Sequence, residues 1–398
     1  MSEFNASNFK KEEGGQGPDI IGTTELTSSY FMVPPSGTTA QRPSGCAPGT
    51  LRFNTDIGSL EYFKGDTIGW ESIDRTTPNL GGGTDSNKGT GARAIFAGGY
   101  TPSVNPNDSF NNVDYLTIPT TGNTQDFNNL TANLAGGYAT ADTTRVVHSG
   151  GIGPRAYTPG VTIQTIQYAN FASTGDYVAG GDLGNTRAFG AAICDATRSI
   201  CASRGMPSYN DSIDYFTTQT AGNGQDFGDI HSAIGYSAGM MSSTRGLIAG
   251  GVFCCPGVTH NTIEYVTIST TGDAVDFGDI SSTRYEMASF GSSTRGVLAC
   301  GNGPGYTNII EYFTISTLGN GVDFGDATNL NGTGKYGASS PTRGVFGGGY
   351  VQSGASFSNV LEYIQIQTTG NSTDFGDFQG FGRRGAGSEG ISNAHGGL

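Results

Sequence analysis

The sequence predicts an all-β fold built as a six-bladed β-propeller, and three observations support this prediction. One pattern occurs six times between Tyr115 and Phe375, as in TRGLIAGG…NTIEYVTISTTGDAVDFGDI over residues 244–280. Glycine accounts for 66 of the 398 residues, and charged residues for only 14%. The apolar runs between the glycines and prolines are too short for helices. At this length, the repeats favour one large all-β domain over two separate domains.

A tyrosine marks each copy of the repeat, and successive tyrosines are 47 to 53 residues apart. This is the length of a kelch-type repeat, which forms one propeller blade. A phenylalanine follows the tyrosine by twelve residues in five copies, whereas copy two has Gly180 there. The constant spacing indicates that each copy is one structural unit. The six tyrosines are Tyr115, Tyr168, Tyr215, Tyr265, Tyr312 and Tyr363.

Each copy contains four strand candidates, which in copy four are RGLIAGG, TIEYVTIS, AVDFGDI and the following EMASFGSS. The first begins at an aligned arginine and ends in a glycine pair, which allows the backbone to turn with positive φ. The fourth contains small residues, which suit the narrow inner edge of a blade. The aromatic residues of the second and third strands are wide enough to fill the wedge between adjacent blades.

The two ends of the repeat region predict how the propeller closes. The C-terminal segment RRGAGSEGISNAHGGL aligns with residues 284–298 at an offset of 100, which places an innermost strand at about 385–391. The first copy begins at Arg93 without such a strand, so we expect the C-terminal strand to complete blade one and leave no open edge. A rival arrangement uses Leu60–Phe63 and Trp70 as outer strands of a seventh blade.

The residues before the propeller divide into three parts. Residues 1–50 read as an extended or flexible attachment arm, and residues 51–73 as a small β-hairpin module of three short strands. Residues 74–91 form a Gly-rich linker, so residues 92–398 form the propeller. The N-terminus lacks the apolar core of a signal peptide, and no apolar stretch is long enough for membrane insertion.

The charge and the cysteines exclude further classes of protein. The formal net charge is −14 and the sequence pI is about 4.6, so the chain repels phosphate backbones and we expect no nucleic-acid binding. The six cysteines match no zinc pattern and read as buried residues or free thiols, including the adjacent Cys254 and Cys255. The four histidines lie at unlike repeat positions, so we expect no metal and no cofactor.

Charged residues recur at equivalent places in the repeats, and two interpretations are open. A ring of carboxylates could bind a metal or a sugar, whereas a repeated hydrogen-bonded ion pair would tie the strands of each blade together. Sixfold repetition favours the structural interpretation, because catalytic groups are rarely needed six times. The chain also lacks the nucleophile elbow, the zinc-protease motif and the loops of a kinase, so we expect no enzymatic activity. The residues are Arg93, Arg145, Arg198, Arg245, Arg295 and Arg343, with Asp126, Asp226, Asp276, Asp323 and Asp374.

The loop after the glycine pair predicts where binding occurs. The separation from arginine to tyrosine is 22, 23, 17, 20, 17 and 20 residues, whereas the rest of the repeat is nearly constant. Variation confined to one rim is how repeat scaffolds carry binding function, and tyrosine beside Gly, Ser and Asn is a typical recognition mixture. The alternative is that these aromatic residues only cover the blade tops. The candidates are Tyr100, Asn107, Phe110, Arg155, Tyr157, Tyr209, Phe253, Tyr306, Tyr350 and Phe357.

The repeat resembles the kelch-like propeller repeat of virion structural proteins from marine tailed phages, cyanophages especially. The resemblance rests on TRG-x-hydrophobic-AGG…IEY-x-TI-x-TTGN-x-x-DFGD. The upstream stretch PPSGTTAQRPSG…GTLRFNTDIGSLEYFKGDTIGWESI is similar to a module of tail-fibre and other virion proteins. Together they cover residues 34–398. Copy two departs most, with Gln167 for the acid and Ala179-Gly180 for Asp-Phe.

The resemblance implies a virion component, assembled in the host cytoplasm, that docks on other virion proteins through residues 1–90 and displays the propeller. The leading hypothesis is a tail-fibre-like adhesin that binds a host cell-surface glycan or protein. The alternatives are a capsid or tail decoration protein with a purely structural role and, third, a carbohydrate-active propeller enzyme. Homo-oligomerisation, such as the trimer common in fibres, is left open.

Overall fold

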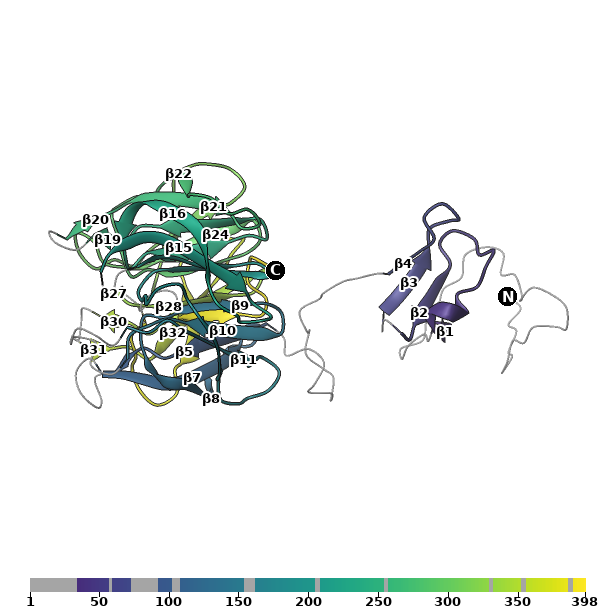
Figure 1. Cartoon of the computed structure of the whole chain (residues 1–398), viewed down its shortest axis with the longest axis horizontal. Coiled ribbons are helices and arrows are strands. Elements are labelled where there is room, and N and C mark those ends of the chain that lie inside the picture. Colours follow the sequence, from purple (N-terminus) through teal and green to yellow (C-terminus); the bar gives the residue numbers. More distant parts are fainter. Residues whose placement is uncertain are drawn as a thin grey trace, which may run out of the picture. The chain divides into compact units, whose positions relative to one another are not determined.

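The computed structural model describes residues 34–56, 59–72, 92–101, 108–153, 162–204, 208–253, 257–328, 332–351, 356–385 and 389–398. They form many small, mostly antiparallel sheets, and the predicted all-β fold is confirmed. The only helix among them is a single 3₁₀ turn, η1 (Thr39–Gln41). The chain divides into two compact units, residues 1–77 and residues 78–398, which are described separately (Figure 1).

The N-terminal unit contains one four-stranded sheet. Its strands are β1 (Ser36–Gly37), β2 (Leu51–Asn54), β3 (Ser59–Phe63) and β4 (Trp70–Ser72), in that order. β1 runs parallel to β2, and the other pairs are antiparallel. Residues 34–50 therefore include a strand and a helical turn rather than being extended throughout. Arg42 ties this segment to the sheet by its hydrogen bond to Glu61 of β3.

The second unit contains six sheets with one recurring strand order, named here sheets 1 to 6. Sheet 1 is β34 (Gly390–Ser392), β5 (Arg93–Ala97), β7 (Asp108–Thr117) and β8 (Gln125–Leu134), with β6 (Tyr100–Thr101) also paired to β7. Sheet 2 is β9 (Tyr138–Ala141), β10 (Arg145–Ser149), β11 (Thr165–Asn170) and β12 (Val178–Asp182). Sheet 3 is β13 (Ala191–Cys194), β14 (Arg198–Arg204), β15 (Asn210–Thr217) and β16 (Gln225–Ile234).

Sheets 4 to 6 repeat this order. Sheet 4 is β17 (Ala238–Met241), β18 (Arg245–Ala249), β21 (Thr262–Thr267) and β22 (Val275–Asp279). Sheet 5 is β23 (Ala288–Gly291), β24 (Arg295–Ala299), β25 (Ile309–Thr314) and β26 (Val322–Asp326). Sheet 6 is β28 (Tyr336–Ser339), β29 (Arg343–Gly347), β32 (Val360–Gln365) and β33 (Thr373–Asp377).

Two small sheets are formed mainly by the loops after the glycine pairs, and β27, which precedes β28, joins one of them. One is the hairpin β19 (Val252–Phe253) and β20 (Val258–Thr259), between the second and third strands of sheet 4. The other is β27 (Gly332–Thr333), β30 (Tyr350–Val351) and β31 (Ser356–Phe357), beside sheet 6.

The first strands of the six sheets contact one another in a closed cycle, β9–β13–β17–β23–β28–β34 and back to β9. Their residues are almost all buried and most are small, as the sequence indicated, with Tyr138, Phe290 and Tyr336 as large exceptions. A Cβ atom added at Gly239 would lie 2.1 Å from the carbonyl oxygen of Ala192, and one at Gly337 would lie 2.5 Å from that of Ser289. Only glycine permits so close an approach of two backbones.

The C-terminal strand β34 pairs with β5, the strand of the first arginine, with Ile391 opposite Ile95. This strand covers residues 390–392, later than the expected 385–391. The two ends of the repeat region therefore meet in sheet 1, and β34 occupies the place that a sheet's own first strand takes elsewhere.

Candidate functional site

The aligned arginines hold neighbouring sheets together. Each guanidinium lies over the tyrosine of its own sheet, at 4.1 to 4.5 Å from the ring centre. A nitrogen of each also donates to a backbone carbonyl of the next sheet, as Arg198 does to Ile268 at 2.7 Å. The last one closes the cycle, since Arg343 donates to Ile118 at 3.0 Å. Among the described residues none of the six makes an ion pair, so the ion pair expected for them is wrong: tyrosine and carbonyl groups take that place.

The acids that precede the tyrosines alternate in their partners from sheet to sheet. In the odd sheets they pair with buried arginines: Asp114 with Arg383 at 2.8 Å, Asp214 with Arg187 at 2.9 Å, and Glu311 with Arg284. In the even sheets, Gln167 and Glu264 accept backbone N–H groups of Thr131 and His231, and Glu362 accepts the Ser372 hydroxyl. Asp214 and Glu311 of the odd sheets also accept a backbone N–H, from Gly184 and Ser281, so the buried arginine is what distinguishes them. Burial raises the pKa of Asp114 and of Glu264. Buried arginines paired with these acids therefore occur at every second sheet.

The Asp-Phe-Gly-Asp segments form contacts between sheets. The phenylalanines are buried and the first aspartates Asp126, Asp226, Asp276, Asp323 and Asp374 are exposed. The following glycine has φ near +145° in four copies, and a Cβ added there would meet backbone atoms of the next sheet at 2.4 to 2.5 Å. The Asn or Asp four residues before the phenylalanine, or before Gly180 in copy two, accepts a backbone N–H of the preceding sheet at 3.0 to 3.2 Å. This motif is explained by packing.

The ten candidate binding residues divide into three groups. Asn107, Arg155 and Tyr157 lie outside the described residues. Tyr100 and Phe110 are 8% and 7% exposed: Tyr100 stacks on Phe189, and Phe110 packs edge-on against Phe381. These two therefore fit the interpretation in which aromatic residues cover the sheets. The other five are at least partly exposed.

The five partly exposed aromatic residues gather in two places, named here the 209/253 cluster and the 306/350/357 cluster. The rings of Tyr209 and Phe253 are 5.9 Å apart. Tyr350 lies 5.8 Å from Tyr306 and 6.1 Å from Phe357. Each cluster joins the loop of an odd sheet to the loop of the next even sheet, so it belongs to one pair of sheets. Phe253 is 40% exposed and lies at the end of β19, in the β19–β20 hairpin.

A series of backbone hydrogen bonds at the same end of the sheets was not predicted. Each bond joins one sheet to the next: Phe189 N–H donates to Gly136 at 2.7 Å, Tyr236 to Phe189 at 2.5 Å and Glu286 to Tyr236 at 3.0 Å. Gly334 N–H then donates to Glu286 at 3.0 Å. All five residues have positive φ, although three are not glycine. The residue types differ and the bonds are made by the backbone, so no sequence pattern identifies this series of hydrogen bonds.

The side chains of Phe189 and Tyr236, two residues of this series, form a row of aromatic rings with Tyr285. Phe189 and Tyr236 stack with ring centres 4.7 Å apart, and Tyr236 lies 6.2 Å from Tyr285. Beside them Arg384 bonds both carboxylate oxygens of Glu286, at 2.5 and 2.7 Å. Phe189 and Glu286 are buried, so this aromatic row packs beneath the loops and exposes little surface for binding a ligand.

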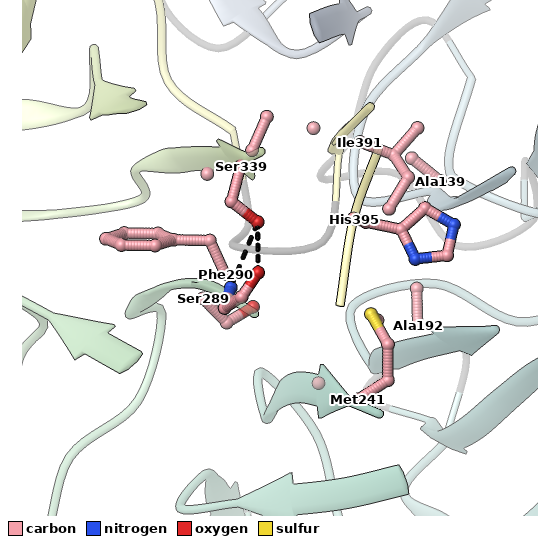
Figure 2. A pocket seen from close by; sticks show the side chains of 13 residues that line it. Ala139, Ala192, Met241, Ser289, Phe290, Ser339, Ile391 and His395 are labelled. Atoms are coloured by element: carbon pink, nitrogen blue, oxygen red, sulfur yellow. Dashed lines mark hydrogen bonds between the residues drawn. The ribbon is translucent and has the colours of Figure 1, made fainter. Parts of the chain in front are cut away.

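A cavity of ≈ 20 Å³ lies between the first strands, lined by small side chains together with Met241, Phe290 and His395 (Figure 2). This volume holds about one water molecule and no larger ligand. The His395 ring bonds the Ala141 carbonyl at 2.9 Å, and burial lowers the pKa of His395 to about 4. The C-terminal residues thus close one end of the space between the sheets.

Within the described ranges, no three His, Cys, Asp or Glu side chains are arranged to hold a metal ion. The same residues include no helix with the length and apolar character that crossing a membrane requires. Cys46, Cys194, Cys201 and Cys300 are free thiols, whereas Cys254 and Cys255 lie outside the described residues. No protein-family model matches this chain, and no curated protein is similar to it.

Proposed function

We propose that sheets 1 to 6 are the blades of a six-bladed, kelch-like β-propeller that β34 closes. Three sixfold features support this fold: the cyclic contacts of the first strands, the arginine bonds from each sheet to the next, and the Asn or Asp bonds at the outer strands. Each of these series returns from sheet 6 to sheet 1. A closed cycle of six blades leaves no place for a seventh between blade six and blade one.

The protein acts as a non-enzymatic structural component of a phage virion, attached through residues 1–90 and recognising the host surface with the loop end of the propeller. The single observation that carries this proposal is the separation of the aromatic residues into two roles. The tyrosine rings of the repeat are covered by arginine guanidinium groups. The 209/253 and 306/350/357 clusters, in contrast, lie in loops of variable length and remain partly exposed. Exposed aromatic rings beside polar groups are typical anchors for a glycan or protein surface.

The test compares two double variants of the full chain, F253A/Y350A and V275A/V322A. Val275 and Val322 are 54% and 49% exposed on the fourth strands of sheets 4 and 5, outside the loops, so they control for loss of apolar surface. Labelled protein is titrated on a panel of marine cyanobacterial strains and on a glycan array. F253A/Y350A should bind at least tenfold more weakly, about 1–2 kcal/mol for an interface anchor. V275A/V322A should bind like the unchanged protein.

Equal binding by the two variants would contradict recognition by the loop end. If the unchanged protein binds no strain and no glycan, the second candidate, a decoration protein with a purely structural role, accounts for the data instead. That candidate is favoured by Tyr100 and Phe110, which the fold has covered. Turnover of any glycan would revive the third candidate, an enzyme.

A further inference from the structure

The two tyrosines of the 306/350/357 cluster are both tied to one short segment, residues 285–286, which precedes β23. Tyr285 and Asn302 exchange backbone hydrogen bonds at 2.8 and 3.0 Å, and the Asn302 side chain donates to the Tyr285 hydroxyl at 2.7 Å. Asn302 in turn forms an isolated β-bridge with Tyr306. The position of Tyr306 therefore depends on Tyr285.

Tyr350 is tied to the same segment through Glu286. The Thr333 hydroxyl donates to a carboxylate oxygen of Glu286 at 2.7 Å, and Thr333 of β27 lies opposite Tyr350 of β30 in their antiparallel pairing. The Gly334 N–H also donates to the Glu286 carbonyl oxygen at 3.0 Å. Glu286 and Thr333 are each 3% exposed, so little water competes for the hydrogen bond between them.

Arg384 joins residues 285–286 to the C-terminal segment that leads to β34. Its guanidinium bonds both carboxylate oxygens of Glu286, at 2.5 and 2.7 Å, and such charge-assisted bonds fix the orientation of a carboxylate. The Arg384 backbone exchanges hydrogen bonds with Tyr100 of sheet 1, at 2.8 and 3.0 Å. Arg384 therefore contacts sheet 1 with its backbone and Glu286 with its side chain. Loss of this guanidinium would leave the buried carboxylate without its cation.

The 209/253 cluster offers an internal reference, because its hairpin is held by backbone groups. β19 pairs with β20, and Val252 forms a β-bridge with Gly235. Tyr236 takes the position of Glu286 in the series of backbone hydrogen bonds, so this position carries no carboxylate beside the 209/253 cluster. A change at Arg384 should therefore act on one cluster and spare the other.

We propose that Arg384 is a positioning residue for the 306/350/357 cluster, so that docking of the C-terminal segment on sheet 1 also orders Tyr306 and Tyr350 for binding. Without the bonds from Arg384 to Glu286, the strands of the six sheets persist but β27 and β30 lose their fixed placement. Ordered anchors bind more tightly because less loop ordering remains to be done on binding. This inference rests on the role proposed for the cluster, but its structural part is tested without a ligand.

The experiment measures amide hydrogen exchange of the full chain by mass spectrometry, for the unchanged protein, R384A, T333V, R384A/T333V and Q379A. Gln379 is exposed in the same C-terminal segment, and the hydrogen bonds described for it use its backbone, so Q379A is the matched control. In R384A and T333V, exchange in β27 and β30 should become about tenfold faster or more, while exchange in β19 and β20 stays unchanged. Because both changes act through Glu286, the double variant should exchange there no faster than R384A. Q379A should exchange like the unchanged protein.

Unchanged exchange in β27 and β30 would overturn the proposal, and so would exchange that rises equally in all sheets, since Arg384 would then only stabilise the fold. T333V keeps both charges and nearly the same side-chain shape, so it decides the question if R384A does not fold. Binding to the cyanobacterial strains and glycans is also measured, and R384A should bind more weakly than the unchanged protein, as Y350A does. Normal binding by R384A beside weakened binding by Y350A would overturn the proposal. If the unchanged protein binds nothing, the proposed function fails, and the exchange data alone decide the role of Arg384.

Discussion

Replacing Gly325 by alanine tests whether the Asp-Phe-Gly-Asp glycines are required by contact between sheets. Gly325 of β26 has φ +141°, and an added Cβ would lie 2.5 Å from the carbonyl oxygen of Gly370 in sheet 6. Gly370 itself has φ +153° but has no atom within 4 Å of its hypothetical Cβ. The two glycines thus share a backbone conformation and differ only in the space around them.

The two variants should therefore differ in stability by the cost of the clash alone. Both G325A and G370A place a side chain in a backbone region disfavoured by about 1–3 kcal/mol. G325A must also displace the backbone of the adjacent sheet, and overpacking of this kind costs about 1–3 kcal/mol more. G325A should then be destabilised by about 2–6 kcal/mol, and G370A by about half as much.

The assay is urea unfolding of the full chain followed by circular dichroism, because Trp70 fluorescence reports only the N-terminal unit. The two midpoints should separate while the slopes stay equal, since both variants expose the same surface on unfolding. If G325A is no less stable than G370A, the two sheets are not in the close contact described, and the packing explanation of the motif fails.

Three further changes probe the sheets. His148 is fully buried in β10, neither ring nitrogen has a hydrogen-bond partner in the described structure, and burial lowers its pKa to about 4. Because the folded pKa lies below the ordinary value of 6.5, stability falls as pH falls from about 6.5 towards 4, by about 3 kcal/mol from this residue. H148L, which copies Leu298 of sheet 5, should remove that part of the pH dependence in urea titrations; an unchanged pH profile would refute the assignment. R284A leaves the buried carboxylate of Glu311 unpaired and should cost about 3–5 kcal/mol, whereas R295A, whose partners are Tyr312 and a carbonyl, should cost less; the reverse order in thermal unfolding would contradict the roles given to the two arginines. Truncation after residue 388 removes β34 and should lower the thermal midpoint by at least 10 °C, and a shift of one or two degrees would show that closure contributes little.

The strands were predictable from the sequence because their spacing is constant. Tyr265 and Phe277 lie twelve residues apart since the same hairpin is built in each sheet, with a register shift between Ile263 and Glu264 that has equivalents in other sheets. The glycine pairs were predicted to allow a turn with positive φ, and Gly250 and Gly251, for example, both have positive φ.

The partners of the charged residues were not predictable in the same way. An arginine that recurs beside an acid suggests an ion pair, but sequence cannot show that Arg245 lies over Tyr265 and reaches a carbonyl seventy residues away. The loop lengths of copies three to six alternate between 17 and 20 residues, and the buried arginines also occur at every second sheet, but these arginines lie outside the aligned positions. The series of hydrogen bonds through Phe189, Tyr236 and Glu286 is made by backbone groups, so it does not depend on residue type and cannot be recognised in the sequence.

The proposed role is tested most directly by locating the protein on the particle. Antibody raised against residues 92–398 is bound to intact phage particles and imaged by electron microscopy. Label at the tail or baseplate, with the loop end accessible, is the result expected of a component that recognises the host surface. Label over the head would contradict this role and leave a decoration protein, and the absence of label from every particle would contradict the assignment to a virion.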